Sequence, residues 1–367
     1  MSFKLLYLYP VDHWKKIIKK QMPTHQLFGM FDLIDNFKQD RKKTIGYLKD
    51  DLPGEVHFLQ LNEKRSRYIP KIIYYSLVRI KHGLRVLFSA KKYDLIFDVQ
   101  YQIHPFIGVA KRCGFLRNTE IMVYLHNPRT FKLAFMVGRC KAYLFYCEEH
   151  YNYAIKLRPD LKHLFYLNKW FPDINYYINI SAKPKNEYSK PYFIDNGRTE
   201  RDHNILIKAS EYSSIPIIIP KASALLLGSI PELVNYYEPN FENDILINTL
   251  IYNSRGIVIP LKKRKNKKTL LTPYGITSFL DAIALGVPVI CSDNACFVDT
   301  INKHKLGLVF DSSSALDLSH KLEELYYDNT LFQQLSNNIK EYSKTHTIHK
   351  TSYLLKKIIL AIKNSDN

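Results

Sequence analysis

The sequence predicts an α/β protein with two domains, each containing a parallel β-sheet covered by helices. Its 367 residues are long for a single hydrophobic core. With 46% hydrophobic residues, the chain has the composition of a globular protein. Short apolar strands alternate with helical segments in two blocks, and this alternation is typical of parallel sheets covered by helices.

The first block contains four predicted strands and two predicted helices. The strands are Phe3–Tyr9, Tyr93–Val99, Ile121–Leu125 and Lys141–Cys147, and the helices are Thr24–Asn36 and Pro105–Cys113. The pattern then blurs through Phe171–Lys190. Pro172 and Pro184 in that stretch, with Pro191 just beyond it, predict an interdomain linker.

The second block contains five predicted strands and ends in helices. The strands are Tyr192–Asp195, Ile215–Ile219, Gly256–Pro260, Val287–Cys291 and Gly307–Phe310. The helices are Ala315–Tyr326, Leu331–Ser343 and a last one at Lys350–Asn364.

The most informative segment runs from Leu271 to Ile290. A Pro/Gly loop leads into a short apolar helix that ends at Gly286 and is followed by a buried strand. The helix begins in Gly275-Ile276-Thr277-Ser278, and a helix N-terminus favours phosphate through its N–H donors and its dipole. Asp281, one turn further on, is a carboxylate and would not bind phosphate, but it can accept hydrogen bonds from ribose hydroxyls. The combination indicates a nucleotide diphosphate site.

A structural alternative exists for the same helix start. Ser278-Phe279-Leu280-Asp281 fits a capping box, Ser-x-x-acid before an apolar run, and this would explain both polar positions without a ligand.

A second segment, Pro191–Ala209, is predicted to be strand, glycine turn, basic loop and helix. The turn carries Gly197 and Arg198, and Arg201 follows. Guanidinium groups suit phosphate because they bond in a fork and stay charged. The alternative is a solvated basic turn with Asp202 as the helix cap.

Both segments resemble retaining glycosyltransferases of family 4, which have the GT-B fold. Asp281–Ile290 is similar to the family's Glu-Ala-Met-Ala-x-Gly-x-Pro-Val-Ile helix, and Gly197–Ala209 looks like its Gly-Arg-x-x-Arg-Asp-Tyr segment. The resemblance implies two Rossmann-like domains facing each other across a cleft. The domains would be an acceptor-binding domain at 1–183, a nucleotide-sugar-binding domain at 184–345, and a C-terminal helix at 346–367 that packs back on the first domain.

The resemblance also assigns site residues. The expected catalytic residues are Arg198 and Arg201, which would neutralise the leaving diphosphate, and His126 near the transferred sugar. The expected donor-binding residues are Gly197, Gly275, Ile276, Thr277, Ser278 and Asp281. His126 also follows a predicted strand, where α/β sheets bind ligands, although a lone histidine is more often a loop or packing residue.

The sequence departs from the family pattern in two places. The first Glu of the family's Glu-x₇-Glu pair falls at Pro273, or at Thr272 if the loop is one residue longer. A Gly-Gly loop that is frequent after the first strand is replaced by Tyr9-Pro10-Val11-Asp12-His13. Asp12 and His13 are therefore the expected acceptor contacts.

The function implied is transfer of a sugar from a UDP- or GDP-sugar to a glycan or lipid-linked acceptor, with retention. Surface polysaccharide or lipopolysaccharide assembly is the expected setting. The donor is a substrate, and no cofactor is expected. No essential metal is expected either, because no cluster of His, Cys, Asp or Glu with metal-ligand spacing is recognisable.

The net charge of +19 indicates a polyanionic partner, and anionic membrane and nucleic acid compete as explanations. Between Arg65 and Lys92, apolar residues recur at helical spacing among basic ones, as in a membrane-surface helix. The alternative is a helix that packs its apolar stripe on the sheet. Lys262–Lys268 is a second dense basic segment.

The expected location is cytoplasmic, peripheral to the inner face of the cell membrane. No stretch approaches the roughly 20 apolar residues of a membrane span, and the N-terminus shows no signal-peptide pattern. The five cysteines lack a Cys-x-x-Cys pair, which favours a reducing compartment.

Three other functions remain open at this point. A basic nucleic-acid-binding protein would explain +19 and 27 tyrosines, but not the Gly275–Ile290 motif, and no nucleic acid partner is expected. A sugar-nucleotide epimerase on the same fold would need acid and base carboxylates that cannot be placed. A transferase-like protein that lost activity with the first Glu is the third.

Overall fold

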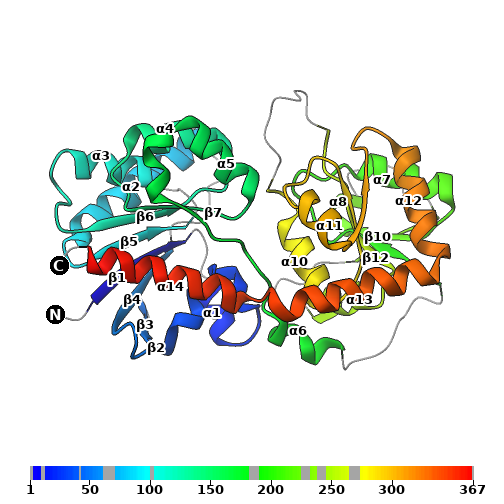
Figure 1. Ribbon diagram of the computed structural model, residues 1–367, viewed down its shortest axis with the longest axis horizontal. Coiled ribbons are helices and arrows are strands. Elements are labelled where there is room, and N and C mark those ends of the chain that lie inside the picture. Colours follow the sequence, from blue (N-terminus) through cyan, green and yellow to red (C-terminus); the bar gives the residue numbers. More distant parts are fainter. Residues whose placement is uncertain are drawn as a thin grey trace. The chain divides into compact units, whose positions relative to one another are not determined.

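The computed structural model describes residues 3–9, 13–40, 43–60, 71–99, 103–181, 190–224, 232–237, 245–263 and 273–365. The chain divides into two compact units (Figure 1). Unit 1 comprises Met1–Lys16, Gln26–Trp170 and Thr351–Asn367, and unit 2 comprises Ile17–His25 and Phe171–Lys350. Each unit has its own sheet, and the α/β class with two largely parallel sheets is confirmed.

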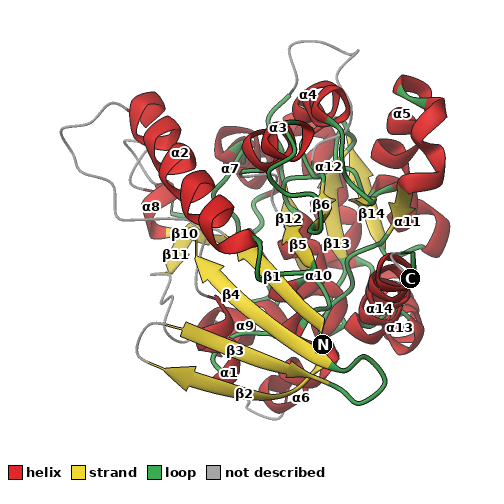
Figure 2. Ribbon diagram, turned by 90° about the vertical axis from the view of Figure 1, so that its left-hand side faces the viewer, coloured by secondary structure: helices red, strands yellow, loops and turns green. Residues whose placement is uncertain are grey.

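The sheet of unit 1 has eight strands in the order β2-β3-β4-β1-β5-β6-β7-β8. Their bounds are Phe3–Tyr9 (β1), Ile34–Asp40 (β2), Lys43–Leu48 (β3), Gly54–Gln60 (β4), Leu95–Asp98 (β5), Glu120–Tyr124 (β6), Ala142–Phe145 (β7) and Phe165–Leu167 (β8). β1 pairs in parallel with β4 and β5, whereas β3 is antiparallel to both β2 and β4. Figure 2 shows β2 and β3 continuing the sheet beyond β4.

The helix expected over Thr24–Asn36 is wrong. Two 3₁₀ turns, Thr24–Leu27 and Phe31–Leu33, precede β2. Between them Phe28 and Gly29 have φ of 52° and 86°, a left-handed backbone that ends a helical path.

Helices α2 (Lys71–Ala90), α3 (His104–Arg112), α4 (Phe131–Val137) and α5 (Glu148–Leu157) cover one face of this sheet (Figure 1). Right-handed crossovers that proceed in one direction along the sheet place successive helices on the same face. The inward sides of α2 to α5 contribute to one core with the strands, including Val86, Ile107, Phe135 and Ala154. Helix α1 (His13–Ile18) follows β1.

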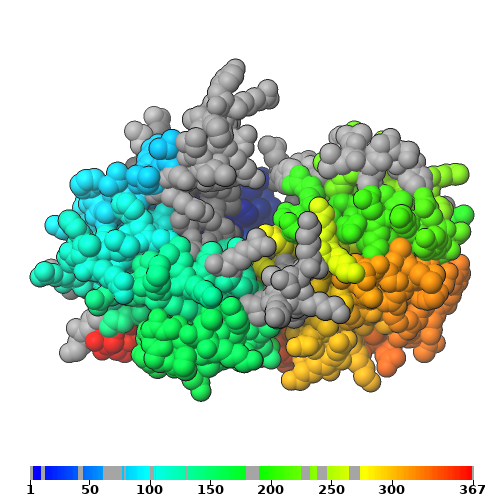
Figure 3. All heavy atoms as spheres, turned by 90° about the horizontal axis from the view of Figure 1, so that it is seen from above, coloured from blue at the N-terminus to red at the C-terminus, as the bar shows by residue number. Residues whose placement is uncertain are grey.

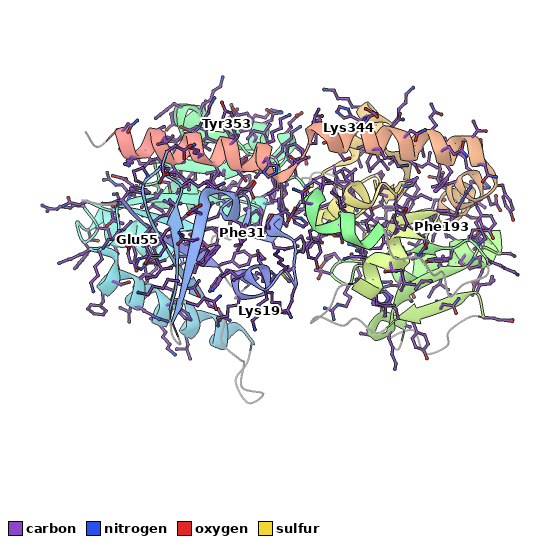
Figure 4. The ribbon with its side chains drawn as sticks, turned by 90° about the horizontal axis from the view of Figure 1, so that it is seen from below. Lys19, Phe31, Glu55, Phe193, Lys344 and Tyr353 are labelled. Atoms are coloured by element: carbon purple, nitrogen blue, oxygen red, sulfur yellow. The ribbon has the colours of Figure 1, made fainter. Side chains whose placement is uncertain are left out.

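Helix α14 (Ile348–Asn364) belongs mostly to unit 1. The Ser352 hydroxyl donates to Asp32, and a Cβ on Gly29 would lie 2.9 Å from the backbone nitrogen of Ser352. Tyr353, labelled in Figure 4, is on the exposed side of this helix.

Unit 2 has a six-stranded sheet in the order β11-β10-β9-β12-β13-β14, and every pairing is parallel. The strands are Phe193–Ile194 (β9), Ile217–Pro220 (β10), Val234–Tyr237 (β11), Gly256–Ile259 (β12), Val289–Ser292 (β13) and Gly307–Phe310 (β14). The helices are Ile174–Ser181 (α6), His203–Ser213 (α7), Lys221–Ala224 (α8), Ile245–Tyr252 (α9), Ile276–Leu285 (α10), Val298–His304 (α11), Ala315–Tyr327 (α12) and Asn329–Thr345 (α13). Phe193, labelled in Figure 4, is fully buried in this sheet.

The segment expected to be a linker is partly structured. Phe171 and Tyr177 belong to the core of unit 2, and Tyr177 lies in α6, which ends at Ser181. The division between the units therefore falls at Trp170/Phe171, earlier than 183/184. Residues 182–189 lie outside the described part of the chain.

None of the helices in the described residues has both the length and the apolar character needed to cross a bilayer.

Candidate functional site

The two motifs predicted to bind the donor lie at the same point of the sheet of unit 2. Strand β9 lies in the middle, and the chain continues to β10 and β11 on one side and to β12, β13 and β14 on the other. In open α/β sheets, ligands bind beyond the carboxyl ends of the strands where the strand order reverses. Residues 195–201 follow β9, and α10 connects β12 to β13, so both predicted motifs lie at this reversal point.

Asp195 is the fully buried residue that follows β9. Its Oδ1 accepts hydrogen bonds from the Gly197 N–H at 2.8 Å and from Arg201 Nε at 3.0 Å. His203 Nε2 lies 3.2 Å from Asp195 Oδ2. A buried carboxylate needs such partners because its desolvation is costly.

Arg201 connects this loop to the start of α10. Its side chain is only 2% exposed, and Nη2 donates to the Ser278 hydroxyl at 2.8 Å. A Cβ on Gly197 would lie 2.2 Å from Arg201 Nη2, so only glycine leaves room for the guanidinium. The resemblance implied that Arg201 contacts the leaving diphosphate, whereas in the structure its charge is paired with Asp195 and it supports Ser278.

Helix α10 begins at Ile276, with Gly275 as its N-cap, and not at Ser278. Gly275 has φ of 85°, and no side chain forms a capping hydrogen bond at this N-cap. The capping box considered for Ser278 and Asp281 is therefore wrong, because both residues lie inside the helix and Ser278 bonds to Arg201. Thr277 is exposed on the first turn, where helix N–H groups have no intrahelical partners.

Asp281 is the sixth residue of α10, and two neighbouring side chains donate hydrogen bonds to it. Oδ1 accepts a hydrogen bond from the Tyr177 hydroxyl at 2.6 Å, and Oδ2 accepts one from Asn196 Nδ2 at 2.8 Å. These two bonds fix the orientation of the carboxylate. Asp281 is therefore a partly buried carboxylate with a fixed orientation near the N-terminus of α10.

A segment from near the N-terminus supports Tyr177. The His25 ring lies parallel to that of Tyr177, with centroids 6.4 Å apart. Thr24 donates through both N–H and hydroxyl to Asp173, which precedes α6, and the Asp173 N–H donates to His25 Nδ1. Burial lowers the pKa of His25 to about 4, so its ring is neutral near pH 7 and Nδ1 can accept.

Arg198 is exposed on the loop after Gly197, in contrast to Arg201. Burial, followed by the charge of Asp195, raises the pKa of the Tyr237 phenol, and Arg198 opposes that rise. Tyr237, at the end of β11, therefore lies within electrostatic range of Asp195, Arg198 and Asp281.

The site residues predicted in unit 1 are His126, His13 and Asp12. His126 follows β6, and burial together with His150 lowers its pKa to about 4, so it is neutral at pH 7. The His13 ring packs edge-on against Tyr9 at 5.3 Å. Asp12 lies outside the described residues, as do positions 264–268 of the lysine-rich segment.

Three residues of the site had not been assigned from the sequence: Asp195, Asn196 and Tyr177. Asp195 and Asn196 adjoin the predicted Gly197-Arg198 turn, so their nearness to it was a usable signal. Tyr177 is 104 positions from Asp281, in a segment expected to be a linker, and carried no such signal. No group of three or more His, Cys, Asp or Glu in the described residues could hold a metal ion.

Comparison with known proteins bears on this arrangement. Residues 267–346, which include α10, match the family model described as Glycosyl transferases group 1. The protein is a glycosyltransferase. No curated protein matched the chain at a significant level.

The fold is similar to that of several solved glycosyltransferases. Sucrose-phosphate synthase from Thermosynechococcus elongatus has a TM-score of 0.70 and 10% identity, over 99% of this chain and 100% of that chain. α,α-Trehalose 6-phosphate synthase from Burkholderia multivorans has a TM-score of 0.67 and 10% identity, over 100% of both chains. HepE from Anabaena, solved in complex with UDP, has a TM-score of 0.64 and 11% identity, over 98% of this chain and 100% of that chain. These similarities confirm the GT-B fold.

Proposed function

We propose that unit 2 binds a nucleoside diphosphate sugar at the start of α10, and that the enzyme transfers the sugar with retention, as in family 4. The observation that carries the proposal is the Asp281 carboxylate, which Tyr177 and Asn196 hold at the sixth position of α10. In this arrangement the amides of Gly275–Ser278 bind the diphosphate and Asp281 accepts bonds from the ribose.

The chemistry requires stabilisation of a departing diphosphate. Negative charge grows on that group in the transition state, and oriented N–H donors and guanidinium groups stabilise it. Arg198, exposed beside Gly197, contacts the diphosphate in the proposal. Arg201 acts as a positioning residue, because it holds Asp195 and Ser278.

The acceptor is proposed to be a glycan or lipid-linked molecule in surface polysaccharide or lipopolysaccharide assembly, met at the inner face of the cell membrane. His126 is assigned to the transferred sugar, and Asp12 and His13 to the acceptor, on the resemblance. The net charge of +19 supports an anionic membrane partner.

Nucleotide binding tests the proposal directly. HepE was solved with UDP, so UDP is the first probe and GDP the second. A ligand at about 100 times its Kd stabilises the folded state by about 2.7 kcal/mol, which raises Tm by several degrees. We expect one of the two diphosphates at millimolar concentration to produce this shift. Unmoved Tm with UDP, GDP and their sugars would contradict the nucleotide site.

Replacing Asp281 with asparagine tests the ribose contact. The amide keeps an acceptor for Tyr177 but loses the charge that strengthens bonds from ribose hydroxyls. We expect at least about tenfold weaker binding of the diphosphate, or roughly 1.4 kcal/mol, in calorimetric titration. Asp328→Asn is the matched control, since Asp328 caps α13 and asparagine caps helices equally well. Equal affinity in Asp281→Asn and the control would leave Asp281 a structural residue only.

A further inference from the structure

Helix α2 exposes a stripe of large apolar side chains to solvent. The stripe residues recur at helical spacing, and their exposed fractions run from 44% for Leu84 to 85% for Phe88. They are Leu77, Ile80, Leu84 and Phe88. An ordinary surface helix directs its apolar side chains to the core, whereas these four side chains of α2 face solvent.

The side of α2 that faces the core of unit 1 carries other residues. Val86 and Ala90 are fully buried in the core of unit 1. A Cβ on Gly83 would lie 2.5 Å from the Phe106 ring, so α2 and α3 approach closely through a glycine. His82 is also buried and Leu87 packs against the same core, so the described side chains of α2 are apolar on two sides, one facing the core and one facing solvent.

The neighbouring helices extend the apolar surface. Helices α2, α3 and α4 lie on one face of the sheet, the face seen in Figure 3, where α2 is light blue and α3 and α4 are turquoise. Exposed apolar side chains on or just after α3 and on α4 are Val109, Phe115, Leu133 and Met136. Exposed apolar side chains on three helices that contact one another in sequence order are typical of a surface that binds a partner.

The charged residues of these three helices are all basic. Helices α2, α3 and α4 contain no acidic residue. Exposed cations on them and on the adjoining loops are Lys81, Arg85, Lys91, Lys92, Arg112, Arg117 and Lys132. Of the acids on the adjoining loops and strands, Glu120 forms an ion pair with Lys111, and Asp94 accepts a hydrogen bond from the backbone N–H of Lys4.

We propose that the α2–α4 surface docks on an anionic lipid bilayer, with Leu84 and Phe88 inserted below the headgroups and the cations at headgroup level. Apolar residues flanked by Lys and Arg are the pattern of interfacial helices. A nucleic acid would use the cations but would leave the apolar stripe in water. A second copy of the chain would bring the same cations against each other. The proposal deepens the peripheral location proposed above by naming the surface and adding insertion to charge attraction.

Vesicle flotation tests the docking. The protein is expected to float with phosphatidylcholine vesicles containing phosphatidylglycerol and to float much less with phosphatidylcholine alone. Inserted side chains make part of the binding resistant to about 0.5 M salt, at which the Debye length is only a few ångströms. The double variant Leu84→Gln, Phe88→Gln should bind at least about tenfold more weakly and should become fully salt-reversible.

A matched control separates this surface from apolar exposure in general. Leu316 and Tyr327 are exposed apolar residues on α12 of unit 2, and the double variant Leu316→Gln, Tyr327→Gln should bind as the unchanged protein does. Equal loss in both double variants would overturn the assigned surface. Absence of flotation, or a solution dimer that Leu84→Gln, Phe88→Gln dissociates, would overturn lipid as the occupant.

A native thiol reports insertion. Cys113 is the exposed cysteine between α3 and Phe115, and the other cysteines are buried or partly buried. An environment-sensitive fluorophore on Cys113 in a Cys296→Ala background should shift to the blue on anionic vesicles, and an unchanged spectrum on bound protein would contradict insertion. A Tm shift with UDP, measured in parallel, is independent of this surface. A failed flotation with an intact UDP shift overturns the docking alone, and the reverse result overturns the nucleotide site alone.

Discussion

Replacing Arg201 with alanine is expected to destabilise unit 2 by about 3–5 kcal/mol, the usual cost of removing one partner from a buried ion pair. The Asp195 carboxylate is fully buried and would lose the guanidinium at 3.0 Å, and Ser278 would lose its donor. His203, 3.2 Å from the other oxygen, is the remaining basic group beside that carboxylate among the contacts described.

Denaturant unfolding of the ligand-free protein measures this loss, with the transition of unit 2 analysed by itself because a protein with two units need not unfold in one step. The double variant Arg201→Met, Asp195→Asn removes both charges and should recover part of the stability. With the single variants Arg201→Met and Asp195→Asn it completes a double-mutant cycle, and the coupling energy from that cycle should be large. A loss below about 1 kcal/mol in Arg201→Ala, the scale of an exposed ion pair, would show that the pair is not buried in solution.

Local signals in the sequence predicted much of unit 2. Strand β14 has the predicted bounds, and α10 lies between the expected loop and Gly286, because glycine and proline mark those ends. The motif around Gly275 placed the helix start at the carboxyl side of the sheet. The exact cap was missed, because Ser278 and Asp281 fit a capping box locally while their true partners, Arg201 and Tyr177, are distant in the chain.

In unit 1, local patterns were less reliable. Residues 24–36 have helix-like apolar spacing, but the left-handed backbone at Phe28 and Gly29 breaks it and β2 begins at Ile34. The side of α2 that faces the core was also undetermined from the pattern. Which side of α2 faces the core depends in part on the close approach of Gly83 to Phe106, and this is a tertiary contact.

Replacing Arg198 with alanine is expected to reduce turnover by about 10²–10³-fold, the effect typical of removing one donor that stabilises transition-state charge. Stability should change by less than about 0.5 kcal/mol, because Arg198 is exposed. KM for the donor should change less than kcat, since the negative charge on the leaving diphosphate is greater in the transition state than in the bound donor.

Release of nucleotide from the donor sugar that gives the largest Tm shift provides the assay, because it does not require a known acceptor. Lys208→Ala is the control, since it removes one exposed cation from α7 in the same unit, outside the loop after β9. The turnover of Arg198→Lys should lie between those of Arg198→Ala and Lys208→Ala, because lysine keeps the charge but lacks the forked pair of donors. Arg198 and Arg201 are three positions apart and carry the same charge, yet the first should govern rate and the second stability. This contrast follows from their burial, and equal turnover in Arg198→Ala and Lys208→Ala would remove Arg198 from the chemistry.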